Sequence, residues 1–213
     1  MFDIEIKKAT DPQACLVLAH GAGAGKEHEF MQDISHKLCA HNINVVLFNF
    51  PYMQTIKETD KRRPPDKADK LLVHFESVID KVVEDGNALP LFIGGKSMGG
   101  RMASMLLDNL EQVEGAVALG YPFHPPGKPE KTRTAHLECM NKPMLIIQGE
   151  RDTFGTQQEI LQYSLADSIE MAFLIDGDHS FKPRKASGKT QQMHIESAAR
   201  IAADFIKCQL PRY

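Results

Sequence analysis

The sequence predicts a doubly wound α/β domain, and two features of the chain support this. Short apolar runs rich in β-branched and aliphatic residues alternate with longer segments whose apolar residues lie three and four positions apart. Apolar strands that alternate with amphipathic helices are typical of a mostly parallel sheet covered by helices on both faces. A chain of 213 residues is also long enough for one large core. We therefore expect residues 1–213 to form a single α/β domain.

The order of the elements follows from these patterns. The predicted strands are the apolar runs 15–20, 44–50, 89–95, 115–121, 142–148 and 170–176. The predicted helices are the amphipathic segments 28–41, 67–85, 99–112, 156–166 and 190–208. The segment DIEIKK near the N-terminus alternates apolar and polar residues, as an edge strand with one wet face does. We expect it to pair antiparallel at the margin of the sheet.

Composition excludes several classes of protein. Hydrophobic residues make up 42% of the chain and charged residues 25%, and no apolar stretch approaches the ~20 residues of a membrane helix. The N-terminus lacks the basic and apolar regions of a signal peptide, so we expect a cytoplasmic protein. A pI of 6.3 and few aromatic residues in the basic loops do not favour nucleic-acid binding. We expect a small-molecule substrate, no membrane and no nucleic acid.

The four cysteines do not form a recognisable site. Cys15, Cys39, Cys139 and Cys208 are far apart, with no CxxC pair and no histidine at metal-ligand spacing. We expect them to be reduced and mostly buried, and we expect neither a metal nor a cofactor.

Gly95-Lys96-Ser97-Met98-Gly99 is the most informative motif. It matches G-x-S-x-G, in which a strand turns sharply into a helix and exposes the central serine. An apolar strand precedes it and a helical pattern follows, as this motif requires. Ser97 also falls at the carboxyl end of its strand, where open α/β sheets bind ligands. It is the predicted nucleophile.

A serine nucleophile needs a base and an acid, which this strand-to-helix motif places later in the chain in the order Ser, acid, His. Asp152 follows one predicted strand and His179 follows the next. Asp176 and Asp178 are less favoured as the acid because they lie too near His179 to come from a separate strand end. His124 and His136 remain alternative bases. The other histidines are predicted to be solvated or half-buried in helices, namely His28, His36, His41, His74 and His194.

The loop HGAGAG at 20–25 follows the first core strand and is expected to supply an oxyanion hole. The amides of Ala22 and Met98 are the predicted donors, with Gly23 as a substitute. A dinucleotide-binding loop would need a third glycine at position 26, where Lys26 stands.

Taken together, LAHGAGAG, GGKSMGG, QGERD and GDHSF resemble the motifs of the α/β-hydrolase superfamily. With NFPYM, RRPP, GYPFHPPGKPEKTRTAHL and FKPRKASG, nearly the whole chain resembles a compact bacterial hydrolase-like family. That family is related to a non-enzymatic subunit of an animal histone-acetylation (NSL) complex and to a testis-expressed protein. The resemblance implies the triad Ser97, Asp152 and His179 but no substrate. Cap insertions of the superfamily commonly follow the strand at 115–121, and the short gap at 121–142 predicts that none is present.

Three loops that leave strand ends are strongly basic. Segments 57–67, 127–133 and 182–189 carry twelve basic and four acidic residues, although the chain has a net charge of −3. A cationic rim favours an anionic substrate, while solvated charges without a ligand are the alternative. The candidate substrate-binding residues are Lys96, Arg101, His124 and Arg133. Lys96 and Arg101 could instead brace the turn around Ser97 against a neighbouring carboxylate.

These observations lead to two expected functions. The first is a serine hydrolase that cleaves a small ester or thioester through an acyl-enzyme, with a possible preference for anionic substrates. The second is a binding or scaffold protein that keeps the fold without useful turnover. The oligomeric state does not follow from the sequence.

Overall fold

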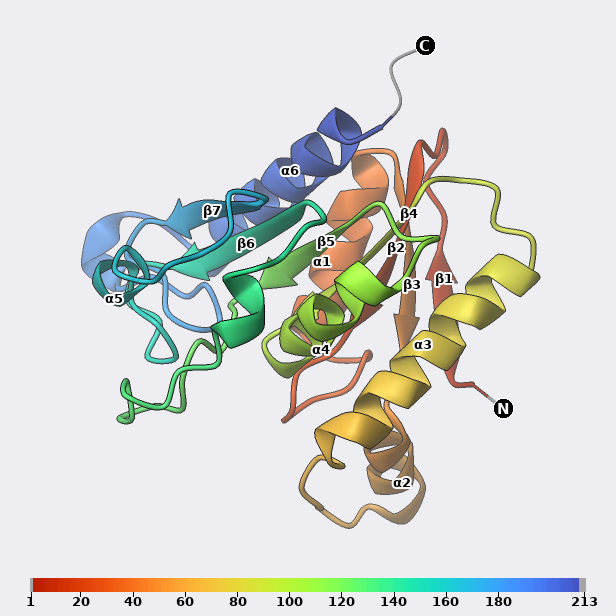
Figure 1. Ribbon diagram of the computed structural model, residues 1–213, viewed down its shortest axis with the longest axis horizontal. Coiled ribbons are helices and arrows are strands. Elements are labelled where there is room, and N and C mark those ends of the chain that lie inside the picture. The colour runs from red at the N-terminus through yellow and green to blue at the C-terminus, as the bar shows by residue number, and fades with distance from the viewer. Residues whose placement is uncertain (1, 211–213) are drawn as a thin grey trace.

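The computed structural model describes residues 2–210, which form a seven-stranded sheet flanked by helices (Figure 1). The strand order is β1-β3-β2-β4-β5-β6-β7, and every neighbouring pair is parallel except β1 with β3. The strands are β1 (Ile4–Lys7), β2 (Ala14–Ala19), β3 (Ile43–Phe48), β4 (Leu91–Lys96), β5 (Gly115–Leu119), β6 (Met144–Gly149) and β7 (Ile169–Leu174). The predicted antiparallel edge strand is therefore confirmed, and the fold is the predicted doubly wound α/β architecture.

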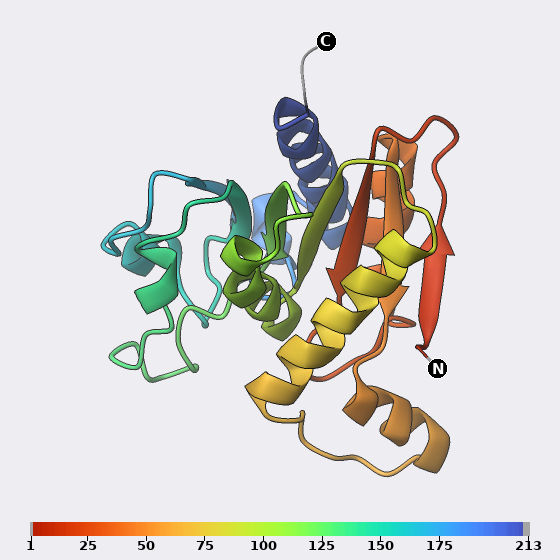
Figure 2. The same ribbon diagram turned by 45° about the vertical axis from the view of Figure 1, so that its right-hand side comes forward.

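Helices cover both faces of the sheet (Figure 2). The pair α1 (Glu29–Ala40) and α6 (Gln191–Cys208) packs on one face, and the pair α3 (Ala68–Glu84) and α4 (Met98–Leu106) packs on the other. β2, β5 and β6 are buried at every residue because they lie inside this sandwich. Continuous burial explains why these strands read as uninterrupted apolar runs.

Two helical expectations were wrong. No helix was predicted between the strand 44–50 and the helix 67–85, but α2 (Pro51–Thr59) forms there. Pro51 starts this helix, where a missing N–H costs nothing, and burial of Tyr52 and Met53 holds it against the core. The helix expected over 156–166 is only α5 (Gln157–Ile160). A Thr156–Glu159 capping box starts α5, but the amide of Ala166 bonds to the carbonyl of Leu137, which draws the following chain away from a helical path.

Further expectations about single residues were also only partly right. Cys15 is buried, but Cys139 and Cys208 are exposed, and all four cysteines are free. His194 is buried rather than solvated or half-buried, and its Nδ1 lies 2.8 Å from the carbonyl oxygen of Phe181.

Between β5 and β6 the described chain contains only the short 3₁₀ helix Ala135–Leu137, which is in keeping with the absence of a cap domain. Within residues 2–210, no helix has the length and apolar character that crossing a membrane demands.

Candidate active site

Ser97 occupies a strained turn between β4 and α4. Its backbone angles are φ 52° and ψ −114°, a conformation that L-residues rarely adopt. The turn leaves no room for side chains on its glycines: a Cβ on Gly95 would lie 2.6 Å from the amide nitrogen of Gly100, and a Cβ on Gly99 would lie 2.5 Å from the carbonyl oxygen of Ala19. The motif requires glycine at these positions because the backbones around this turn are in close contact.

Three predicted site residues meet at this turn. The Oγ of Ser97 lies 2.9 Å from Nε2 of His179, and Nδ1 of His179 lies 2.7 Å from Oδ2 of Asp152. His179 follows β7 and Asp152 follows β6, so three separate strand ends supply the three groups. With its proton on Nδ1 and facing the carboxylate, the imidazole presents a free Nε2 lone pair to the serine hydroxyl.

The Asp152 carboxylate is fully buried and held by two further donors. Gln148 donates its Nε2–H to Oδ2 at 2.9 Å, and the amide of Phe154 donates to Oδ1 at 2.8 Å. The Phe154 ring also packs on the imidazole of His179, with 4.2 Å between ring centroids. Gln148 and Phe154 orient the acid and the base. Sequence reasoning missed both because neither residue type signals this role.

The alternative acids and bases are engaged elsewhere. Asp176 pairs with Arg184 and Arg151, and Asp178 accepts backbone amides of its own loop. His124 is buried, with its Nδ1 near the carbonyl of Pro125, and it faces Glu159 at 3.5 Å. His136 lies 2.8 Å from the hydroxyl of Ser104. Among the candidate bases, only His179 is bonded to Ser97.

Lys96 braces the histidine loop. Its Nζ donates to the carbonyl oxygen of His179 at 2.6 Å and lies over the rings of Phe30 and Phe181, 5.6 and 5.8 Å from their centroids. Burial lowers the pKa of Lys96 to about 8, against the opposing attraction of Asp152 and Asp178. Of its two predicted roles, bracing fits these contacts, although the partner is a carbonyl and not a carboxylate.

Lys96→Met is therefore expected to separate activity from stability. The apolar side chain fits the same aromatic slot, so the free energy of unfolding is expected to stay within about 1 kcal/mol of the wild type. The His179 loop loses its anchor, and kcat is expected to fall about tenfold with little change in KM. Urea unfolding and ester kinetics measure the two effects. An unchanged kcat would show that the His179 loop keeps its conformation without the contact to Lys96.

The predicted oxyanion donors belong to two segments next to the serine. Ala22 lines the same cavity as Ser97. Met98 is the first residue of α4, so its amide has no acceptor within the helix. The Tyr52 hydroxyl braces the loop by donating to the carbonyl oxygens of Gly21 and Ala22 at 3.2 and 3.0 Å. The Tyr52 contact was not predicted, because no helix was expected between the strand 44–50 and the helix 67–85.

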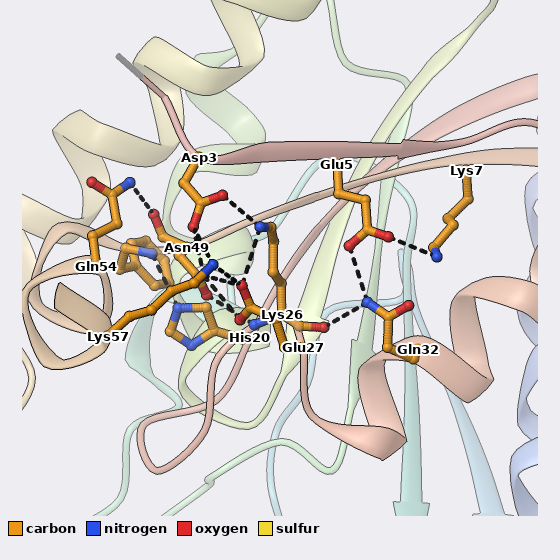
Figure 3. Close-up of polar contacts among 11 residues, drawn as sticks. Asp3, Glu5, Lys7, His20, Lys26, Glu27, Gln32, Asn49, Gln54 and Lys57 are labelled. Atoms are coloured by element: carbon orange, nitrogen blue, oxygen red, sulfur yellow. Dashed lines mark hydrogen bonds and ion pairs between the residues drawn. The ribbon is translucent and has the colours of Figure 1, made fainter. Parts of the chain in front are cut away.

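A polar cluster behind this loop ties it to the sheet edge (Figure 3). Asn49 is fully buried, and its Oδ1 accepts the amide of Lys26 at 2.8 Å. Its Nδ2 donates to Asp3 at 2.9 Å and to Glu27 at 3.1 Å. The Lys26 ammonium also contacts Asp3 at 2.5 Å. The segment that carries Ala22 is thus fixed to β1 and to the end of β3.

Asn49→Ala is expected to lower the free energy of unfolding by about 2–3 kcal/mol, because it leaves the Lys26 amide buried without an acceptor. Loosening of the neighbouring loop is expected to lower kcat/KM as well. Chemical denaturation and ester kinetics measure both. Asn141→Ala, which removes an exposed asparagine far from this loop, is the control and is expected to change neither quantity appreciably. Equal stability of the two variants would contradict the role of Asn49.

His20 makes the fold sensitive to acid. Its Nδ1 lies 2.7 Å from the carbonyl of Gly21, and its Nε2 accepts the amide of Phe50 at 3.0 Å. Burial lowers the pKa of His20 to about 4, from 6.5 for an exposed histidine. Between these values the unfolded chain binds a proton that the folded chain excludes, so the free energy of unfolding falls as the pH falls from 6.5 to 4. Thermal unfolding across this range is expected to show a shallower decline in His20→Gln.

One cavity opens on the serine. It measures about 390 Å³ and is formed by the 20–25 loop, the start of α1 and the histidine loop. Its apolar lining includes Phe30, Met31 and Phe154. Of the predicted substrate-binding residues, Lys96 lines this cavity, whereas Arg101, His124 and Arg133 do not.

The basic loops are less cationic than their sequences suggest. Arg184 pairs with Asp176, Lys57 pairs with Glu27, and Arg63 pairs with Asp66. The predicted cationic rim is therefore partly neutralised by acidic residues of the same protein.

Comparison with known proteins agrees with this fold. Residues 12–207 match the alpha/beta hydrolase domain family. A serine hydrolase without a lid from Xanthomonas campestris is 17% identical and superposes with a TM-score of 0.73 over 100% of this chain and 91% of its own. A dienelactone hydrolase from Anabaena variabilis is 18% identical, with a TM-score of 0.73 over 98% and 92% of the two chains. An esterase from Pyrococcus furiosus is 13% identical, with a TM-score of 0.70 over 98% and 91%. At these identities the structural likeness is one of fold, and the family match places this chain in the α/β-hydrolase domain family.

Proposed function

We propose that the protein is a serine hydrolase that cleaves a small ester or thioester through an acyl-enzyme intermediate. The observation that carries the proposal is the unbroken chain of hydrogen bonds from Ser97 Oγ through His179 to the buried carboxylate of Asp152. A serine hydroxyl is a weak nucleophile at neutral pH, and this arrangement is the one that activates it.

The chemistry follows from the atoms in place. Ser97 Oγ attacks the carbonyl carbon of the substrate while Nε2 of His179 takes the hydroxyl proton. The amides of Ala22 and Met98 stabilise the negative charge on the tetrahedral oxygen. His179 then gives its proton to the leaving alcohol or thiol, and the acyl group stays on Ser97. A water molecule attacks this ester by the same route, and Ser97 is released with its proton.

The cavity supports a small substrate. Its volume of about 390 Å³ lies near the lower end of ligand-sized pockets, and its lining is mostly apolar. The short β5–β6 connection leaves the serine without a roof of the kind that buries long lipid tails. A short or aromatic acyl group therefore fits better than a long chain.

A fluorophosphonate probe tests the proposal because it labels only an activated serine. Folded wild-type protein is expected to carry the label on Ser97 in a peptide map, and heat-unfolded protein is expected to carry none. A known serine hydrolase labelled in parallel controls for the reagent. Failure of folded protein to react would favour the alternative of a binding or scaffold protein that keeps the fold without turnover.

A further inference from the structure

Two arginines, one on the helix after the nucleophile turn and one on the loop after β5, have no acidic partner among residues 2–210. Arg101 lies on α4 one turn after Ser97, and its amide donates to the Ser97 carbonyl at 3.1 Å. Arg133 lies on the loop after β5, and its amide donates to the carbonyl of Phe123 at 2.7 Å. Both side chains are half-buried, and across residues 2–210 neither guanidinium forms an ion pair. Four other arginines each pair with an aspartate, namely Arg63, Arg151, Arg184 and Arg200.

Arg101 and Arg133 are both tied to the segment that follows β5. The Ser104 hydroxyl donates to the Arg101 carbonyl at 2.8 Å and lies 3.2 Å from the Tyr121 hydroxyl, and the Arg133 amide is bonded to Phe123. Burial and the charge of Arg101 lower the pKa of Arg133. Burial and the charge of Arg101 also lower the pKa of His136, which lies near Tyr121. Neighbouring positive charges repel each other and destabilise the folded protein. No carboxylate among the described residues is paired with either arginine to offset this repulsion.

The protein leaves hydrogen-bonding capacity of this pair unused. The Nε of Arg101 is buried and has no acceptor among the described residues. Nearby polar groups are already bonded to each other, since the Ser104 hydroxyl lies 2.8 Å from His136 and 3.2 Å from the Tyr121 hydroxyl. A buried donor without an acceptor destabilises the folded protein. An anion with two or more oxygens would satisfy both guanidinium groups, because a guanidinium fork matches such a group.

Arg101 and Arg133 belong to other elements than those that line the cavity. The cavity is lined by residues of α1 and the start of α6, which cover one face of the sheet. Arg101 and Arg133 come from α4, on the other face, and from the loop after β5. A substrate bound across Ser97 can place its apolar part in the cavity and its opposite end near the arginines.

We propose that Arg101 and Arg133 form an anion-binding subsite that recognises an acidic oxygen group, a carboxylate or phosphate, on the ester or thioester substrate. This inference rests on the proposed hydrolase function. It narrows the four candidate substrate-binding residues to two, because the Lys96 ammonium is bonded to the His179 carbonyl and His124 is buried next to Glu159. Two positively charged side chains also discriminate between anionic and neutral substrates, which the mostly apolar lining of the cavity does not do.

Matched substrate pairs test the subsite, with a carboxylate as the probe. In the first pair, 4-nitrophenyl hydrogen glutarate is compared with its neutral carboxamide, which places the charge on the acyl part. In the second pair, the butyryl ester of 4-hydroxybenzoate is compared with that of 4-hydroxybenzamide, which places the charge on the leaving group. The measured quantity is the ratio of kcat/KM for the acid to that for the amide, at low salt and in 0.5 M NaCl.

The wild type is expected to prefer the acid about tenfold or more in one of the two pairs, with the preference reduced by salt. Arg101→Gln and Arg133→Gln are each expected to bring that ratio close to one, mainly through KM. Lys131→Gln removes an exposed positive charge from the same loop as Arg133 and is expected to keep the wild-type ratio. Fluorophosphonate labelling of Ser97 shows that each arginine variant retains a folded nucleophile turn.

Two results would overturn the subsite. One is a wild-type ratio at or below one in both pairs. The other is a ratio that survives in both arginine variants while Ser97 still reacts with the probe. Failure of the hydrolase function itself looks different: none of the four esters is cleaved and folded wild-type protein is not labelled, which overturns the subsite together with the function.

Discussion

Replacing Ser97 with alanine is expected to lower kcat for an activated ester by about 10⁴- to 10⁶-fold. The substitution removes the hydroxyl oxygen that lies 2.9 Å from His179 Nε2. The serine is half-buried, and alanine in its place leaves both flanking elements untouched, so stability is expected to stay within about 1 kcal/mol of the wild type. Steady-state kinetics with 4-nitrophenyl butyrate and thermal unfolding measure the two quantities.

The double variant gives a sharper result. Ser97 and His179 act as one unit, so His179→Ala is expected to be nearly as slow as Ser97→Ala, and the combination no slower than either alone. Independent contributions would instead multiply the two losses. A Ser97→Ala protein that keeps more than about a tenth of wild-type kcat would contradict the nucleophile assignment, because residual catalysis through binding alone is far smaller.

The second large effect is expected from Gly95→Ala. The added Cβ would lie 2.6 Å from the amide nitrogen of Gly100 and 2.8 Å from the carbonyl oxygen of Ala19, and both of these are backbone atoms that cannot rotate away. To make room, α4 would have to move away from β4, carrying the Ser97 turn with it. We expect a loss of roughly 3 kcal/mol in the free energy of unfolding. For a chain of this size that lowers the Tm by roughly 6–12 °C.

Gly23→Ala is the matched control for this experiment. It makes the same chemical change at a glycine in the 20–25 loop, but its Cβ would have no neighbour within 4 Å. Its free energy of unfolding is expected to stay within about 0.5 kcal/mol of the wild type. Calorimetry on both variants separates close backbone packing from the general effect of adding a methyl group. Equal Tm values for the two variants would show that the motif glycine is not required by packing.

Much of the fold could be predicted because its signals are local. Six core strands appear as apolar runs, and the helices of both layers, apart from α2, show the expected spacing of apolar residues. The ends of the strands and helices were less predictable: β4, for example, runs from Leu91 to Lys96 and not over 89–95. The helix α2 was missed because its stability comes from Tyr52 and Met53 packing against distant strands, which no local pattern reveals.

The residues of the candidate site could be named for a related reason. Ser97 directly follows β4, and Asp152 and His179 lie in the loops that follow β6 and β7. The carboxyl ends of parallel strands meet at one edge of the sheet. The supporting residues could not be named. Gln148 lies within β6 and Asn49 directly after β3, and an amide side chain in such a position gives no sign of its partner. Their roles depend on which backbone groups are left without partners once the loops have packed.

By itself the sequence determined the kind of sheet, the glycine-rich turn around Ser97 and the order of the three groups along the chain, because each follows from residue spacing within a short segment. Only the tertiary structure decided which histidine faces the serine, that Lys96 bonds to a carbonyl, and that Arg101 and Arg133 are left without carboxylates. These outcomes depend on contacts between segments more than thirty residues apart. A charge counted in the sequence has no assigned partner until folding brings one near.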